Sequence, residues 1–179
     1  GNGGVFVYAN SFADMNLSAQ YTKGSSGNAA DNSNTVGKSG SSWDFAITNQ
    51  TMMDGLDVGF GYGQIANGAE GQTNGDDTDE HMVAYATYTM GSVTVGYTQA
   101  QISKGAKAAT SEHATGWSIA ANLTDGLSLS YGEREVEMQK ASAAHVTEDM
   151  EGLALAYTMG SAKIAIQNNI SIIYLVDSA

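Results

Sequence analysis

The sequence predicts an all-β fold, a transmembrane antiparallel up-and-down β-barrel of which about ten strands are present. Apolar residues recur at every second position, short turns alternate with long polar stretches, and no amphipathic helix is evident. The hairpin 82–101 shows this best, because the Gly91-Ser92 turn joins two alternating runs directly. Each run has roughly ten residues, which is the length that a tilted strand needs to cross a bilayer.

The first half of the chain supplies two further hairpins. Alternating segments, expected as strands, lie at 5–8, 15–22, 43–48 and 56–62. A short connection at 10–14 and a turn at 52–55 join them in pairs, and polar stretches at 23–41 and 67–80 separate the pairs.

The second half repeats this arrangement. Strands are expected at 117–123, 127–131, 153–159 and 164–166, with tight turns at 124–126 and 160–161 and polar loops at 103–115 and near 138–149. Short turns and long loops therefore alternate, and all the long loops are expected at one end of the sheet.

Composition narrows the class of protein. Charged residues make up only 15% of the 179, below the roughly 25% of soluble domains. The absence of Cys removes disulfide frameworks and zinc fingers, and a net charge of −12 argues against nucleic acid as a partner. No apolar run approaches the roughly eighteen residues of a membrane-spanning helix.

The apolar face of these strands needs a partner layer. In water it would require a second sheet or covering helices, whereas in a bilayer it faces lipid while the Ser, Thr, Asn, Gln and Gly face lines water. The repeat length of some propellers is similar, but a propeller blade has four short strands and this repeat has two long ones. A soluble or surface-exposed all-β adhesin-like or structural protein remains the alternative.

Several short motifs give the chain a family resemblance. Residues 86–92 (ATYTMGS) match 156–161 (AYTMGS), and the pairs Glu80-His81 and Glu112-His113 and the turn Asp125-Gly126 add to the likeness. From Val5 to about Asn169 the chain resembles a Gram-negative general porin of the trimeric, sixteen-stranded type. The resemblance implies a homotrimer in the cell outer membrane and passive diffusion of small hydrophilic solutes and ions through a water-filled pore. We expect no cofactor and no enzymatic activity.

The same resemblance bears on domain organisation. We expect a single β-barrel domain over 1–179, truncated at both ends and corresponding to the sixth through fifteenth strands of such a barrel. The first five strands, the inward-folded constriction loop and the last strand would then be missing. The tail 170–179 is off the pattern, because the family would place a polar loop where Ile172-Ile173-Tyr174-Leu175-Val176 stands.

Strand parity predicts two sets of functional positions. Arg134 and Lys163 would place cations on the inner face, Lys163 near the periplasmic mouth and Arg134 either in the channel or above the membrane rim. The full set expected to line the pore is Asp44, Asp57, Thr94, Ser118, Asn122, Ser128, Ser130, Arg134 and Lys163. The rings expected to face lipid, as interfacial girdles, are Tyr21, Trp43, Tyr62, Tyr88, Tyr97, Trp117, Tyr131 and Tyr157.

Other chemistry finds less support. His81, His113 and His145 are equally spaced, but alternate strands would hold them roughly 10 Å apart, too far for one zinc. No Gly-x-Ser-x-Gly elbow indicates a serine hydrolase. The acidic group Asp76, Asp77, Asp79 and Glu80 is a weak Ca²⁺ candidate, and a solvated surface loop is the better interpretation because the EF-hand spacing is lacking.

Overall fold

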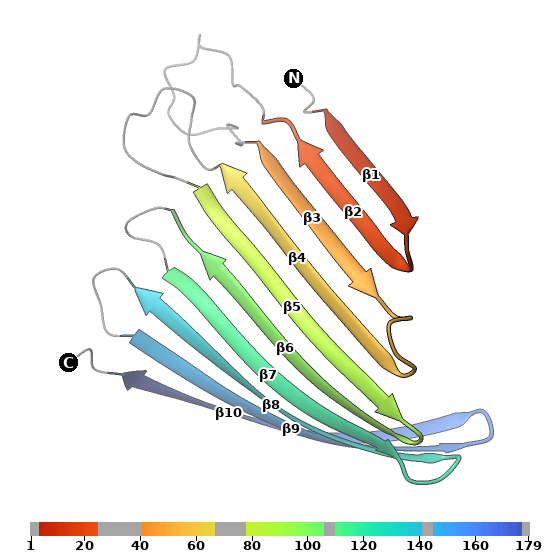
Figure 1. Ribbon diagram of the computed structural model, residues 1–179. Coiled ribbons are helices and arrows are strands. Elements are labelled where there is room, and N and C mark those ends of the chain that lie inside the picture. The colour runs from red at the N-terminus through yellow and green to blue at the C-terminus, as the bar shows by residue number, and fades with distance from the viewer. Residues whose placement is uncertain (1–3, 25–40, 67–77, 106–109, 141–144, 177–179) are drawn as a thin grey trace.

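The computed structural model describes residues 4–24, 41–66, 78–105, 110–140 and 145–176, which form one antiparallel sheet of ten strands in chain order (Figure 1). The strands are β1 (Val5–Phe12), β2 (Met15–Thr22), β3 (Ser42–Asn49), β4 (Leu56–Ala66), β5 (Thr78–Met90), β6 (Val93–Ser103), β7 (Thr110–Asn122), β8 (Leu127–Lys140), β9 (His145–Met159) and β10 (Ala162–Val176). The up-and-down order predicted from the alternation is confirmed. No helix among the described residues is long and apolar enough to span a membrane.

All the short turns lie along one edge of the sheet (Figure 1). Gly91 and Gly160, each at φ 61°, open the two Gly-Ser turns, and a residue without Cβ reaches this left-handed region without strain. Ala13 (φ 49°) and Asp14 (φ 64°) form the β1–β2 turn in the same region. This turn is tighter than the expected connection at 10–14, because the β1–β2 pairing continues to Phe12 and Met15.

The Asn49 side chain organises the turn between β3 and β4. Its Oδ1 accepts hydrogen bonds from the backbone N–H groups of Thr51 (2.9 Å) and Met52 (2.7 Å), and its Nδ2 donates to the Asp14 carbonyl (3.1 Å). Asn49 is only 8% exposed, so it closes its own turn and fastens it to the neighbouring β1–β2 turn.

The strands are inclined to the turn edge as in a barrel. A continuous row of paired residues runs from Met15, the first residue of β2, to Ile170, eight residues into β10. From β2 to β10 the row therefore moves about 27 Å away from the turn edge along the strands while it crosses about 38 Å of sheet. This corresponds to a strand tilt of about 35°. Transmembrane barrels have strand tilts of about 35–45°.

The C-terminal strands are longer than the sequence predicts. β8 and β9 run through most of the loop expected near 138–149, and β7 begins at Thr110, inside the loop expected at 103–115. The tail expected to be off the pattern is also strand as far as Val176, which pairs with His145. The two loop expectations were wrong because pairing with a neighbour satisfies the backbone of residues whose own alternation is weak.

The sheet has no second layer among the described residues. Ala114 and Val136 are the only buried hydrophobic side chains there, whereas Trp117 and Leu153 are 44% and 48% exposed. One face of the sheet therefore presents its apolar side chains outward.

Candidate pore wall and lipid-facing surface

Pairing fixes which side chains share a face, because directly opposed residues point to the same side. Fourteen of the fifteen Phe, Trp and Tyr residues lie on one side, which we call the aromatic face. The opposite side, the small-residue face, carries all the glycines within strands: Gly59, Gly61, Gly63, Gly96, Gly116, Gly132 and Gly152.

The register separates the two predicted sets of positions. All eight rings assigned to lipid lie on the aromatic face: Tyr21, Trp43, Tyr62, Tyr88, Tyr97, Trp117, Tyr131 and Tyr157. All nine residues assigned to the pore lie on the small-residue face: Asp44, Asp57, Thr94, Ser118, Asn122, Ser128, Ser130, Arg134 and Lys163. Contact of these faces with lipid and water stays a prediction.

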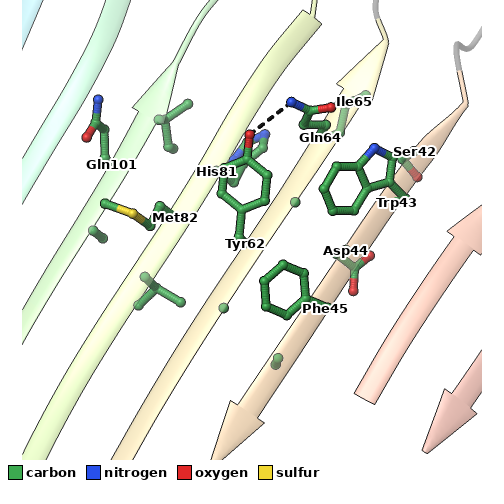
Figure 2. Close-up of a pocket in the computed structure, with 16 residues that line it drawn as sticks. Ser42, Trp43, Asp44, Phe45, Tyr62, Gln64, Ile65, His81, Met82 and Gln101 are labelled. Carbon is green, nitrogen blue, oxygen red and sulfur yellow. Dashed lines mark hydrogen bonds between the residues drawn. The ribbon is translucent and has the colours of Figure 1, made fainter. Parts of the chain in front are cut away.

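The rings of the aromatic face contact one another across strands. Trp43 and Tyr62 have centroids 5.5 Å apart, and Phe45 and Phe60 lie 5.9 Å apart at a tilted angle. Figure 2 shows Trp43, Phe45 and Tyr62 side by side on β3 and β4. Trp117 and Tyr131 make a further pair, 5.6 Å apart and edge to face. These pairs build an aromatic band whose outer surface is left open.

The tyrosine hydroxyl groups of this band donate hydrogen bonds to carboxylates that lie further from the turn edge. Tyr62 Oη donates to Glu80 Oε1 (2.8 Å), and Gln64 Nε2 donates to Tyr62 Oη (2.9 Å; Figure 2) and to Glu80 Oε1 (2.8 Å). Tyr131 Oη donates to Glu133 Oε1 (2.6 Å) and Glu151 Oε2 (3.2 Å). Rings that are apolar in body and wet at one tip suit a membrane–water boundary.

Tyr85 is the one Phe, Trp or Tyr residue on the small-residue face. It pairs with Gly59, where an added Cβ would overlap Tyr85 Cε1, so the ring occupies the space that the glycine leaves. Tyr85 Oη donates to Asp57 Oδ1 (3.1 Å), and Gln50 Nε2 donates to Asp57 Oδ2 (3.0 Å). Asp57 is thus held in place by both of its oxygens.

The two predicted pore cations lie at different distances from the turn edge. Arg134 shares a row with Tyr85 through Thr98 and Gly116, well into the sheet. Lys163 pairs with Thr158 beside the β9–β10 turn and is exposed. Neither makes an ion pair with a described residue.

The described residues do not assemble a metal site. His81 lies on the small-residue face, whereas His113 and His145 lie on the aromatic face. Asp79 and Glu80 are adjacent in β5 and point to opposite faces; Asp76 and Asp77 fall outside the described residues. No group of three or more His, Cys, Asp or Glu suited to a metal occurs in the described part of the chain.

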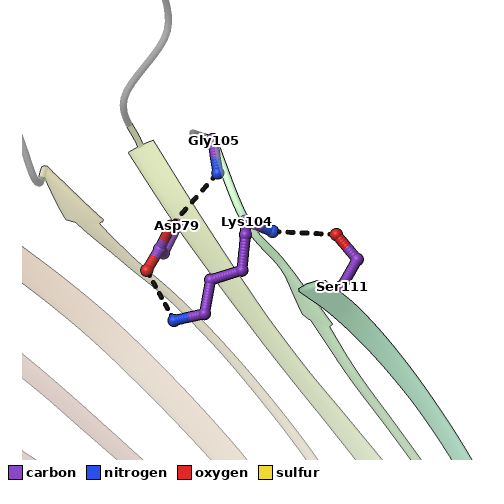
Figure 3. Close-up of polar contacts among 4 residues, drawn as sticks. All are labelled: Asp79, Lys104, Gly105 and Ser111. Carbon is purple, nitrogen blue, oxygen red and sulfur yellow. Dashed lines mark hydrogen bonds and ion pairs between the residues drawn. The ribbon is translucent and has the colours of Figure 1, made fainter. Parts of the chain in front are cut away.

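Asp79 instead anchors the start of the β6–β7 connection (Figure 3). Lys104 Nζ lies 2.7 Å from Asp79 Oδ2, and the Gly105 N–H donates to Oδ1 (3.1 Å). The Lys104 N–H donates to Ser111 Oγ (3.1 Å). The Asp79 carboxylate is almost fully buried, so these bonds tie the loop-side ends of β5, β6 and β7 together.

Comparison with solved structures gives the fold. A loop L8 deletion mutant of OmpT, an outer membrane protein of Vibrio cholerae, superposes with a TM-score of 0.67 at 18% identity, over 95% of this chain and 57% of that one. A trimer form of OmpT folded in vitro gives 0.66 at 17% identity, over 93% and 53%. A porin refined at 1.8 Å gives 0.64 at 16% identity, over 99% and 58%. No protein-family model and no curated protein matches the sequence.

The chain therefore has the fold of an outer-membrane β-barrel, present here as a ten-stranded part. It spans a little over half the length of the solved proteins that it matches. The general-porin resemblance drawn from its hairpins is thus confirmed at the level of fold.

The sequence did not predict three features of the site: the packing of the Tyr85 ring over Gly59, the Lys104 contact with Asp79, and the carboxylates at the edge of the aromatic band. One of them left a signal. Tyr85 stands on the parity opposite to Tyr88 in the same alternating run, so the sequence alone marks it as an exception.

Proposed function

We propose that the protein is an outer-membrane porin that forms a water-filled pore for passive diffusion of small hydrophilic solutes and ions. The observation that carries this proposal is the segregation of side chains between the two faces. Fourteen rings and most of the exposed aliphatic side chains lie on one face without a covering layer, whereas the other face carries the strand glycines and most of the Ser and Thr residues of the strands. A strand inclination of about 35° also supports a barrel that closes around a lumen.

The proposal includes location and assembly. It places the aromatic face in the outer-membrane lipid of a Gram-negative bacterium, with the short turns on the periplasmic side. One of the similar proteins is a trimer form, which supports a homotrimer for this protein too. No enzymatic activity is part of the proposal.

The rival is a soluble or surface-exposed all-β adhesin. Such a protein requires another layer over the aromatic face, since Tyr97 and Tyr157 are 51% and 47% exposed among the described residues. Lipid supplies such a layer without further protein.

Channel recording tests the proposal. The intact protein should stay with membranes after salt and carbonate washing, require detergent for extraction, and give discrete conductance steps in planar bilayers. Recovery from the soluble fraction without detergent, or bilayers that stay silent after confirmed insertion, would overturn it.

A further inference from the structure

We propose that Tyr85 and Asp57 form a binding site for organic cations on the pore wall. This inference rests on the proposed porin function and adds a ligand class to it. Quaternary ammonium and guanidinium groups are the chemistry that an aromatic face beside a carboxylate recognises.

The position of Tyr85 is the first argument. Its neighbours in the row are Gly59 and Thr98, and Gly116 follows on β7. Among the described residues of the small-residue face, Tyr85 is the only Phe, Trp or Tyr. A solute moving along this part of the face therefore meets a single phenol platform.

The orientation of the ring is the second argument. Gly59 leaves room for the ring on the wall, because any Cβ there would overlap Tyr85 Cε1, Cζ and Oη. The ring therefore lies over the Gly59 backbone, and Tyr85 is only half-buried, so part of the ring stays open. The ring is positioned in advance, so binding does not have to order it.

The charge beside the ring is the third argument. Asp57 Oδ1 accepts from Tyr85 Oη, which keeps a carboxylate at the edge of the platform, and Gln50 fixes the other oxygen. The nearest cation in the same row is Arg134, three strands from Tyr85, or roughly 14 Å at the usual strand spacing. The platform therefore lies in a locally negative field.

Block of single-channel current by tetraethylammonium tests the inference in the intact protein. We expect concentration-dependent block of potassium current, weakened about three- to tenfold by Tyr85→Leu, as expected for loss of a cation–π contact. Tyr85→Phe keeps the ring and should keep most of the block. Asp57→Asn should weaken block at low salt and much less at 1 M salt.

Thr98→Leu is the matched control, since Thr98 pairs with Tyr85 on the same face but carries no ring. It should leave block unchanged. Equal block in wild type and Tyr85→Leu, with normal conductance in both, would overturn the inference while leaving the porin function intact. Equal weakening by Tyr85→Leu and Thr98→Leu would overturn it as well. Absence of conductance in the wild type would instead overturn the porin function.

Discussion

Trp117 Nε1 donates a hydrogen bond to Glu133 Oε2 at 3.1 Å, directly across the β7–β8 pair on the aromatic face. Glu133 also accepts from Tyr131, so two rings of the aromatic band turn their polar atoms to one carboxylate. Trp117 itself remains 44% exposed. This arrangement predicts lipid around the ring and water near the carboxylate.

Tryptophan fluorescence checks that placement. Trp43 and Trp117 are the only tryptophans, so Trp43→Phe leaves Trp117 as a single reporter. In vesicles we expect strong quenching of Trp117 by lipids brominated on their acyl chains and weak quenching by aqueous acrylamide. Strong acrylamide quenching with no effect of brominated lipid would contradict a lipid-facing aromatic band.

The register is tested by neighbouring substitutions in β6. Val95 lies on the aromatic face and is 43% exposed, whereas Thr94 lies on the small-residue face, with its Oγ1 2.9 Å from that of Thr89. Val95→Arg should lower the free energy of unfolding in lipid by about 2–4 kcal/mol near the midplane, less toward the interface. Thr94→Arg should cost little and shift ion selectivity toward anions. If Thr94→Arg destabilises more, the two faces are assigned the wrong way round.

Gly59→Ala should disturb the pore wall through Tyr85. The new Cβ would overlap the ring, which must then leave the wall and swing into the open space. We expect reduced single-channel conductance in Gly59→Ala and its recovery in the double variant Gly59→Ala/Tyr85→Ala. Gly96→Ala is the control, because its Cβ would meet Ser118 Oγ and Thr87 Cγ2 at 3.1 and 3.4 Å, contacts that small side chains can relax. A conductance loss that Tyr85→Ala does not relieve would contradict the steric explanation.

Asp79→Asn should weaken the loop-side end of the sheet. The substitution removes the charge that faces Lys104 while keeping the side-chain shape, and Lys104 is about one-third exposed, so solvent screens part of the effect. We expect a loss of about 1–2 kcal/mol in the free energy of unfolding by urea. The exposed Asp44→Asn, on the same face, should change it by less than about 0.5 kcal/mol. Equal effects of the two substitutions would show that the Asp79 contacts do not stabilise the fold.

The net charge of −12 predicts that the proposed pore conducts cations slightly better than anions. The preference should be clear at 0.01 M salt, where the Debye length is about 30 Å, and small at 1 M, where it is about 3 Å. Reversal potentials in a salt gradient measure it. Arg134→Gln and Lys163→Gln should each strengthen the preference, because these cations lie on the same face as the proposed pore wall. Anion preference at low salt would contradict the proposal.

The sequence by itself determined the strands, the tight turns and the division of side chains between two faces. A period of two places Val95 and Thr94 on opposite sides whatever the strand pairs with, and Gly91 specifies its turn through a local backbone preference.

Only the tertiary structure decided how far the pairing extends and which side chains meet. Residues 170–176 became strand because β9 offers backbone partners along their whole length. Glu80-His81 and Glu112-His113 repeat at an even interval, yet Glu80 lies on the aromatic face and Glu112 on the small-residue face. The reason is the strand register, which places even-numbered residues of β5 on the same face as odd-numbered residues of β6 and β7. The parity of Tyr85 marks this residue in the sequence, but its partners Gly59 and Asp57 are decided only when β4 and β5 pair, because they lie far away in the chain.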